Sequence, residues 1–272
     1  MALNQNSCKN LNLIEFIKFS KDFNGVELNF KNIKNIISEN VKLKDILELL
    51  EIYNLKVISI FRLKDFSLSI DRDYRTKVLK NFKQMIDYCY KLESDLIIIN
   101  PSVLKNYPDL NIIPKWRIIN KTRNRIKDLL KRLKGYDIKI GFEFLWHSSI
   151  STLSEAKKVL MPLKGIQENL GYIIDTFHYA KSKEDYNQLK EINLLTFLIQ
   201  LSDLKYDIKN SINNSNSLKD SERIFPGEGD FNLNEFINFT QKIGYRNVYS
   251  IELKNKCLEN LYKKFFRINK ND

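Results

Sequence analysis

The sequence predicts an α/β fold, a single (β/α)8 TIM barrel that occupies residues 1–272. Strand and helix patterns alternate eight times along the chain, and most of the expected strands are apolar runs. No linker divides the chain, and its length suits one barrel, which typically needs about 250 residues.

Eight short apolar segments are the expected strands. Leu96–Ile99, for example, is apolar throughout, which is typical of parallel strands that are buried on both faces. The expected strands cover residues 2–5, 26–30, 56–61, 95–100, 139–144, 172–174, 195–201 and 248–253.

Eight segments with helical spacing of apolar residues separate or follow these strands. They cover residues 11–23, 43–52, 74–92, 118–134, 153–160, 185–191, 233–243 and 259–268. The proline-containing segment 101–117 and the Lys-, Asn- and Ser-rich segment 205–222 are expected loops. A doubly wound sheet is the alternative fold, but the first strand is not followed by a Gly-rich phosphate loop.

The composition indicates a folded protein and a preference for anions. Hydrophobic residues make up 43% of the chain, which excludes the disordered class. The net charge of +12 would favour acidic ligands, but the basic residues are spread along the chain. We interpret the basic helix at 118–134 as a solvated helix face, and we expect no nucleic-acid partner.

Cysteine content and hydropathy predict a cytoplasmic protein without a membrane partner. Cys8, Cys89 and Cys257 are isolated and odd in number, which argues against a disulfide framework and a Cys-based zinc site. The sequence shows neither a run of 18 apolar residues nor a signal peptide.

Side chains with oxygen donors stand near the ends of the last four expected strands. They are Glu143, Asp175, Gln200 and Glu252, separated by 32, 25 and 52 residues. The first two spacings are one strand–helix unit each, and the third is one unit enlarged by the loop at 205–222. Because barrels carry their active sites at the C-terminal ends of the strands, we expect these side chains to meet. The alternative is that each is an ordinary residue at a loop edge.

Three carboxylates and one amide oxygen form an all-oxygen ligand set. Such hard ligands favour one divalent Mn or Mg ion, although Zn or Co can also occupy the set. A divalent cation beside two substrate oxygens would stabilise the enediolate that forms when a proton is removed next to a carbonyl. Glu143 and Glu252 could stand on opposite sides of the metal and act as acid and base.

His178 is one of only two histidines and follows Asp175 by three residues. We place Asp175 at the end of the sixth strand and His178 in the loop after it. The favoured role for His178 is a catalytic contact with the substrate. A buried structural histidine and a hydrogen-bond partner of a carboxylate are the alternatives.

Five further residues are candidates for binding the substrate. Arg223 precedes the turn Phe225–Gly229, whose glycines permit close backbone approach, and its guanidinium suits a phosphate or a carboxylate. For Arg223 the alternative is a surface salt bridge. For Glu228 the alternative is a role in anchoring the loop, for His147 it is a surface loop, and for Arg62 and Trp116 it is a packed or solvated position on the barrel rim. The other candidates are Glu228, His147, Arg62 and Trp116.

Five segments carry a resemblance to a known group of enzymes. The segments are GFEF (141–144), IDTFH (174–178), QLSD (200–203), RIFPGEGDF (223–231) and SIEL (250–253). They resemble motifs of the sugar phosphate isomerase/epimerase superfamily, the xylose isomerase-like TIM barrels. The enzymes of this superfamily that the chain resembles include ketose 3-epimerases, inosose dehydratases, hydroxypyruvate isomerases, metal-dependent 3-dehydroshikimate dehydratases and DNA repair enzymes of the endonuclease IV type. The resemblance spans almost the whole chain.

The resemblance implies metal ligands at Glu143, Asp175, Gln200 and Glu252, and a substrate or proton-handling role for His178. At the position of Gln200, many members of the superfamily have His, whereas the dehydratase-like branch often has Gln. Ketose 3-epimerases often have an Arg about six residues after the ligand that corresponds to Gln200. The present chain has Tyr206 there. The resemblance also implies a homodimer as a possible assembly.

These observations predict a metal-dependent isomerase or epimerase that acts through an enediolate on a small-molecule sugar, sugar phosphate or hydroxy-keto acid. A dehydratase of the 3-dehydroshikimate or inosose type on the same site is the alternative. A DNA repair endonuclease would need a His-rich trinuclear zinc cluster, which two histidines cannot supply. A non-catalytic binding barrel is disfavoured because all four ligand positions carry oxygen donors.

Overall fold

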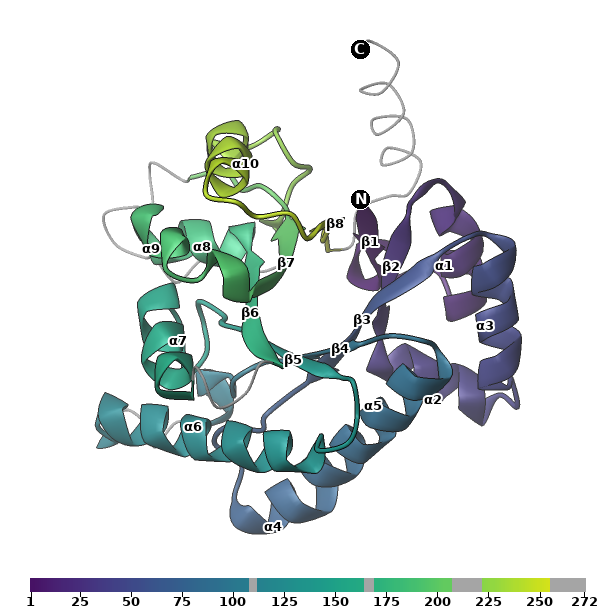
Figure 1. The fold of residues 1–272 in the computed structure, drawn as a ribbon, viewed down its shortest axis with the longest axis horizontal. Coiled ribbons are helices and arrows are strands. Elements are labelled where there is room, and N and C mark those ends of the chain that lie inside the picture. Colours follow the sequence, from purple (N-terminus) through teal and green to yellow (C-terminus); the bar gives the residue numbers. More distant parts are fainter. Residues whose placement is uncertain (108–111, 164–168, 207–221, 255–272) are drawn as a thin grey trace.

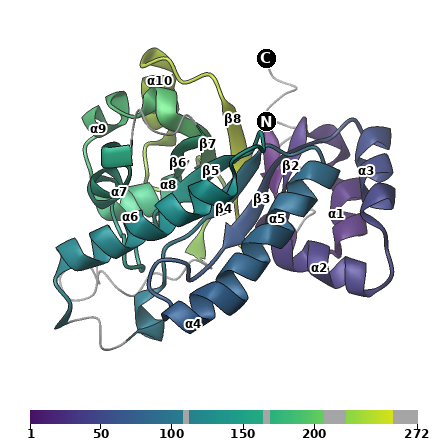
Figure 2. The same cartoon turned by 60° about the horizontal axis from the view of Figure 1, so that its bottom comes forward.

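The computed structural model describes residues 1–107, 112–163, 169–206 and 222–254, and it confirms the predicted barrel. Eight parallel strands pair in sequence order, and β8 closes onto β1 (Figures 1 and 2). The strands are β1 (Ala2–Asn4), β2 (Gly25–Asn29), β3 (Lys56–Leu63), β4 (Leu96–Ile99), β5 (Lys139–Glu143), β6 (Leu170–Asp175), β7 (Thr196–Leu201) and β8 (Val248–Ile251).

Helices surround the strands on the outside of the barrel (Figure 1). The α-helices are α1 (Leu13–Phe19), α2 (Phe30–Ser38), α3 (Leu43–Ile52), α4 (Asp71–Asp73), α5 (Leu79–Lys91), α6 (Lys115–Arg132), α7 (Leu153–Leu160), α8 (Thr176–Ser182), α9 (Asn187–Lys190) and α10 (Leu233–Lys242). Shorter helical segments are the 3-10 turns η1 (Gln5–Cys8), η2 (Ser20–Asp22), η4 (Leu104–Asn106), η6 (Met161–Leu163) and η7 (Asn193–Leu195), and the π-helix η3 (Tyr74–Val78). Within the described ranges, no helix is both long enough and apolar enough to span a bilayer.

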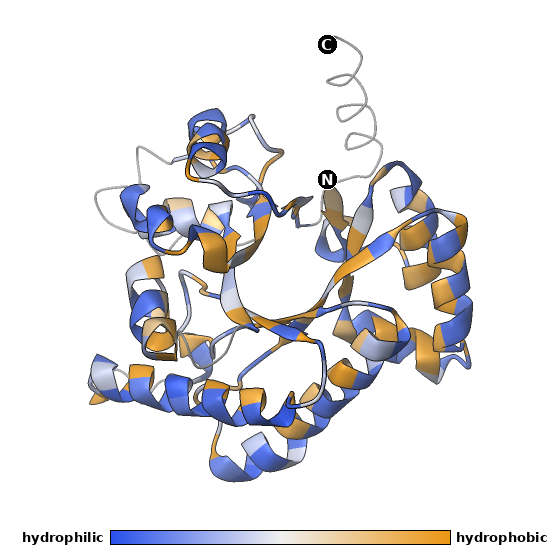
Figure 3. Ribbon diagram, in the orientation of Figure 1, coloured by the Kyte–Doolittle hydropathy of each residue, from blue (hydrophilic) through white to orange (hydrophobic). Residues whose placement is uncertain are grey.

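Apolar side chains form two separate cores, one outside and one inside the barrel. The larger core lies between the strands and the apolar faces of the helices, which Figure 3 shows in orange. The smaller core fills the barrel interior, where every second residue of a strand points inward. Its buried members are Phe61, Leu96, Ile98, Ile173 and Leu198.

The inward positions change from apolar to polar toward the C-terminal ends of the strands. Ile173 belongs to the interior core, and Asp175, two residues later, shares its face of β6. Leu198 and Gln200 follow the same rule on β7, and their partners Ile173 and Asp175 lie opposite them in register. The interior core is therefore the apolar floor of a polar site.

Some expected elements match the structure and others were missed. The helices expected at 43–52 and 153–160 are α3 and α7. Helix α2 was not predicted, because its first residue was assigned to the preceding strand. The expectation that His178 lies in a loop is wrong, since it lies in α8. The helix expected at 259–268, Cys257 and the segment 207–221 of an expected loop lie outside the described residues.

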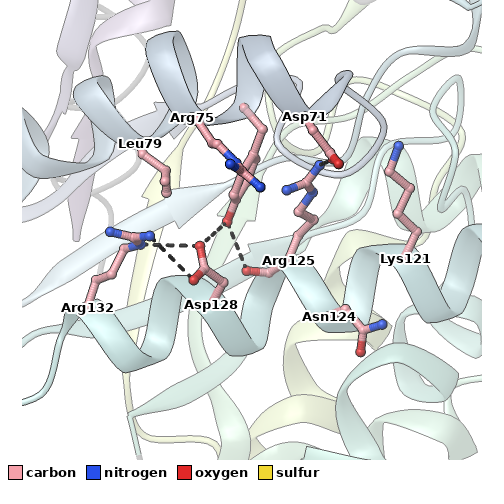
Figure 4. Close-up of a pocket in the computed structure, with 9 residues that line it drawn as sticks. Asp71, Arg75, Leu79, Lys121, Asn124, Arg125, Asp128 and Arg132 are labelled. Carbon is pink, nitrogen blue, oxygen red and sulfur yellow. Dashed lines mark hydrogen bonds and ion pairs between the residues drawn. The ribbon is translucent and has the colours of Figure 1, made fainter.

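The basic helix α6 uses Arg125 to contact α4 and η3 (Figure 4). The guanidinium of Arg125 lies 3.6 Å above the ring of Tyr74 and forms a 2.6 Å ion pair with Asp71. The Tyr74 hydroxyl donates a 2.9 Å hydrogen bond to Asp128, which also pairs with Arg132. The interpretation of α6 as a solvated face therefore holds only for part of the helix.

Candidate active site

The four predicted ligand residues all lie at the C-terminal mouth of the barrel. Glu143 and Asp175 are the last residues of β5 and β6, and Gln200 pairs in register with Asp175. Glu252 follows β8, and its N–H donates to the carbonyl of Leu201 on β7. Each of the four side chains is at most 3% exposed. The structure thus brings strands β5 to β8 together as the spacing predicted.

Asp175 organises the start of helix α8 and thereby places His178. One carboxylate oxygen, Oδ1, accepts a 2.8 Å hydrogen bond from the N–H of Phe177 and caps the helix. Residues three apart on a helix share a face, so the His178 ring lies beside Asp175, with Nε2 3.8 Å from Oδ2. The same Nε2 lies 3.8 Å from Oε1 of Glu143.

Arg223 lies at the centre of this cluster and is only 1% exposed. Its Nη1 donates to Oδ1 of Asp175 at 2.8 Å and to the Ser202 hydroxyl at 2.9 Å. Its Nη2 forms a 2.6 Å ion pair with Oδ2 of Asp175 and a 3.1 Å hydrogen bond with Nε2 of His178. Burial disfavours the charged guanidinium, but the carboxylates of Asp175 and Glu252 raise its pKa above the usual value.

The turn after Arg223 is fixed by the carboxylate of Asp203. This carboxylate accepts hydrogen bonds from the backbone N–H groups of Gly227 (3.1 Å) and Gly229 (2.9 Å). A Cβ atom at Gly229 would collide with the Asp203 carboxylate, so this position requires glycine. The predicted close backbone approach of the turn is confirmed.

The protonation of His178 follows from its contact with Arg223. A guanidinium only donates, so Nε2 of His178 must accept and the ring proton must lie on Nδ1. Burial and the charge of Arg223 lower the pKa of His178 well below its ordinary value. His178 is therefore neutral, and its Nδ1–H has no hydrogen-bond partner within the described residues.

Glu143 is held by a neighbouring asparagine and shifted toward its neutral form. Asn100 Nδ2 donates to Oε2 of Glu143 at 2.8 Å. Burial, followed by the charges of Glu252 and Asp175, raises the pKa of Glu143 to about 8. A carboxyl group with a pKa near neutrality is suited to both taking up and releasing a proton.

A second polar group, around Glu27 of β2, crosses the inside of the barrel. The Glu27 side chain is fully buried and accepts hydrogen bonds from Asn4 (3.0 Å), Ser59 (2.9 Å) and Nε2 of Gln200 (3.0 Å). Burial and the charge of Glu252 raise the pKa of Glu27 to about 7. Because Glu27 holds the nitrogen of Gln200, the amide oxygen of Gln200 points to the other side.

The donor atoms of this cluster fit a divalent metal ion. Glu143, Asp175 and His178 each bring one ligand atom within 4.8 Å of the other two. Buried oxygens without a hydrogen-bond partner in the described chain include Glu143 Oε1 and Gln200 Oε1. Nε2 of His178 is already bound by Arg223, so the amide oxygen of Gln200 is the more available donor. A hard divalent cation would satisfy such oxygens.

The remaining predicted residues lie at different depths. His147 is partly buried, with its ring centroid 6.0 Å from that of His178; burial and Lys254 lower the pKa of His147 to about 4. Arg62 is also partly buried, and its positive charge partly opposes the rise in the pKa of Glu143. Glu228 is exposed on the turn, and Trp116 is 60% exposed with its ring against Arg117.

Several residues of the site were not predicted. Glu27, Asn100 and Ser202 each bind a predicted site residue. The sequence held a signal for Glu27, a charged residue between apolar neighbours in an expected strand. It held none for Asn100, which appeared only as the polar residue before a proline.

The fold agrees with that of a known protein family. A family model described as a xylose isomerase-like TIM barrel matches residues 20–266. The chain belongs to this family. The match extends over all strands except β1, so the family assignment rests on nearly the whole barrel.

Two curated relatives are similar to this chain over most of its length. An inosose isomerase from Bacillus velezensis is 23% identical over 213 residues, which are 78% of this chain and 71% of the relative. A 3-dehydroshikimate dehydratase from Pseudomonas aeruginosa is 23% identical over 235 residues, 86% of this chain but 34% of the relative.

A solved structure shares the fold of this chain. It is a crystal structure of the IOLI protein with a zinc atom bound, with a TM-score of 0.83 at 18% identity. The superposition covers 98% of this chain and 95% of that one.

Proposed function

We propose that the chain is a metal-dependent isomerase or epimerase that moves a proton on a sugar or sugar phosphate through an enediolate. The relatives indicate an enzyme of the isomerase or epimerase type, with dehydratase as the alternative. The observation that carries the proposal is the buried cluster of oxygen donors at the ends of four consecutive strands, β5 to β8.

Glu143, Asp175, Gln200 and Glu252 would hold one divalent ion, with Mn or Mg favoured by the all-oxygen set. When bound, the ion would supply positive charge that stabilises the enediolate. The zinc atom in the structure of the related IOLI protein supports a divalent metal in this fold.

The chain's own residues would move the proton and orient the substrate. Glu143 and Glu252 would stand on either side of the substrate, one removing the proton next to the carbonyl and the other returning it. Asn100 and Asn6 hold these two carboxylates by hydrogen bonds of 2.8 and 2.9 Å. His178 is neutral, and its Nδ1–H, which has no partner among the described residues, would donate to a substrate oxygen.

A dehydratase on the same site is the second candidate. It is favoured by the glutamine at position 200 and by the 23% identity to a 3-dehydroshikimate dehydratase. After the same proton abstraction, a protonated carboxyl group would deliver its proton to a departing hydroxyl. Glu143, whose pKa is raised to about 8, is suited to that step.

The decisive experiment combines metal content with exchange of substrate hydrogen in D2O. We expect about one Mn or Mg per chain, loss of most of it in Glu252→Gln, and solvent deuterium at a substrate carbon without loss of water. Glu48→Gln, on the exposed face of α3, is the matched control and should keep the metal. Elimination of water would favour the dehydratase. Wild-type protein that binds no divalent ion would overturn both candidates.

A further inference from the structure

One stretch of the chain carries most of its excess positive charge. Residues 71–134 contain sixteen Lys and Arg and seven Asp and Glu, so they account for +9 of the net charge of +12. Eight of these cations lie in α6, whose one acidic residue is Asp128. Charge of one sign gathered in a hollow raises the local concentration of the oppositely charged ligand.

Four of the cations line a hollow on the outside of the barrel, between α6 and the segment from α4 to α5 (Figures 2 and 4). Its volume of about 650 Å³ is within the usual range for a small-molecule site. Figure 4 shows Arg75 reaching from η3 toward α6, while Lys121 and Arg125 reach from α6 in the opposite direction. The charged residues of this hollow are Arg75, Lys121, Arg125, Arg132, Asp71 and Asp128.

Shared contacts hold these side chains close together. Lys121 Nζ and Arg125 Nη2 each donate to the same backbone carbonyl, at 3.4 Å. The guanidinium of Arg125 lies 3.6 Å above the ring of Tyr74. The Tyr74 hydroxyl and the Nε atom of Arg132 both bind Oδ2 of Asp128, at 2.9 and 3.2 Å. The cations therefore stand next to one another along one face of α6.

The hollow has more donors than the protein uses. Arg75 forms no hydrogen bond or ion pair with the residues that the structure describes. Lys121 donates to two backbone carbonyls and has no ion-pair partner there. Two carboxylates face four cations, so a net charge of about +2 remains for a ligand. Guanidinium groups offer paired N–H donors that match the oxygens of a phosphate.

A second hollow, of about 1240 Å³, continues the first, because Arg75, Leu79 and Arg132 line both. Several aromatic rings line the second hollow, and two of them are strongly exposed. Tyr90 is 78% exposed and Tyr136 is 50% exposed. Exposed aromatic rings offer flat faces on which the planar ring of a ligand can stack. A cationic hollow thus leads directly into an aromatic one.

We propose that the two hollows together bind a nucleoside polyphosphate, with its phosphates on the cations of the first hollow and its base against the tyrosines of the second. This site is separate from the barrel mouth and goes beyond the proposed function. A second copy of the same face is disfavoured as the occupant, because it would bring like charges together. The compact hollow suits the closely spaced charges of a phosphate chain better than the more widely spaced carboxylates of an acidic protein segment.

The test is the binding of ATP in the presence of chelator, measured by calorimetry. Arg75→Met and Lys121→Met each remove a charge-assisted donor that has no ion-pair partner in the described chain, so the fold should be retained. Each should raise Kd by at least about fivefold. Arg117→Met removes the same charge from an exposed position of α6 outside both hollows and should leave Kd within about twofold.

Further comparisons identify the ligand class. The double variant Tyr90→Ala/Tyr136→Ala should weaken ATP binding by at least about fivefold and leave tripolyphosphate binding within about twofold. ATP and tripolyphosphate affinities that change by the same factor, or not at all, would overturn the nucleotide assignment. A peptide of Glu and Tyr that binds as tightly as ATP would mean an acidic protein segment and overturn it as well. The site itself is overturned if wild-type protein does not bind ATP, or if Arg75→Met and Lys121→Met behave like Arg117→Met.

Discussion

Replacing Arg223 with methionine should destabilise the metal-free protein strongly and make its stability depend on metal. The guanidinium is 1% exposed and forms contacts of 2.6 and 2.8 Å with Asp175. Removing one partner of a buried ion pair leaves an uncompensated charge, which costs about 3–5 kcal/mol. In a chain of this size each kcal/mol shifts Tm by about 2–4 °C, so we expect Arg223→Met to melt about 10 °C lower in chelator.

The measurement is a thermal melt with chelator and with saturating Mn. A divalent ion beside Asp175 would replace part of the missing charge, so Mn should raise the Tm of Arg223→Met more than that of the wild type. Arg117→Met, at an exposed arginine, should melt close to the wild type in both conditions. The reasoning fails if Arg223→Met melts within about 2 °C of the wild type in chelator, or if Mn stabilises both proteins equally.

Two other properties can be tested on the same protein. In Glu27→Gln, the amide of Gln200 can flip and turn its nitrogen toward the metal, so Mn affinity should fall about 10–100-fold with the fold retained; an unchanged titration would contradict this. Burial raises the pKa of the Cys8 thiol to about 12 and raises that of the Cys89 thiol further. In the variant Cys257→Ser, a thiol reagent at pH 8 should therefore react with these two cysteines only after the protein unfolds. The thiols ionise at lower pH in the unfolded chain than in the folded chain. Their burial therefore contributes fully to the free energy of unfolding below about pH 8.5, and this contribution declines above that pH. Chemical unfolding should give a lower stability at pH 10 than at pH 8, and equal stability at both would contradict this prediction.

The barrel could be predicted from the sequence because its parallel strands are buried on both faces. Segments such as Leu96–Ile99 are continuous apolar runs, which a half-exposed antiparallel strand would not show. Helix α2 was missed because Phe30 continues the apolar run of β2, although Asn29 caps a new helix there. A cap residue directly after a strand leaves no polar gap to mark the boundary.

The place of Glu143, Asp175, Gln200 and Glu252 at the barrel mouth could be predicted because each lies at a strand end, and strand ends follow from hydropathy. The contacts between them could not, since they depend on register and side-chain direction. Nothing in the order of residues shows that Glu27 of β2 reaches Gln200 of β7 across the barrel. Likewise, Arg223 is 48 residues from Asp175, and only the turn fixed by Asp203 brings the two together.

The charge balance inside the mouth explains why these acids stand there together. Glu27, Glu143, Asp175 and Glu252 are each at most 3% exposed, and among the described lysines and arginines only Arg223 is comparably buried. Buried carboxylates in such excess are stable only if some stay protonated, which is the direction of the pKa values of Glu27 and Glu143. A barrel selected for stability alone would gain from apolar residues at these positions. Acids that remain despite this cost are expected where a divalent cation is to be bound.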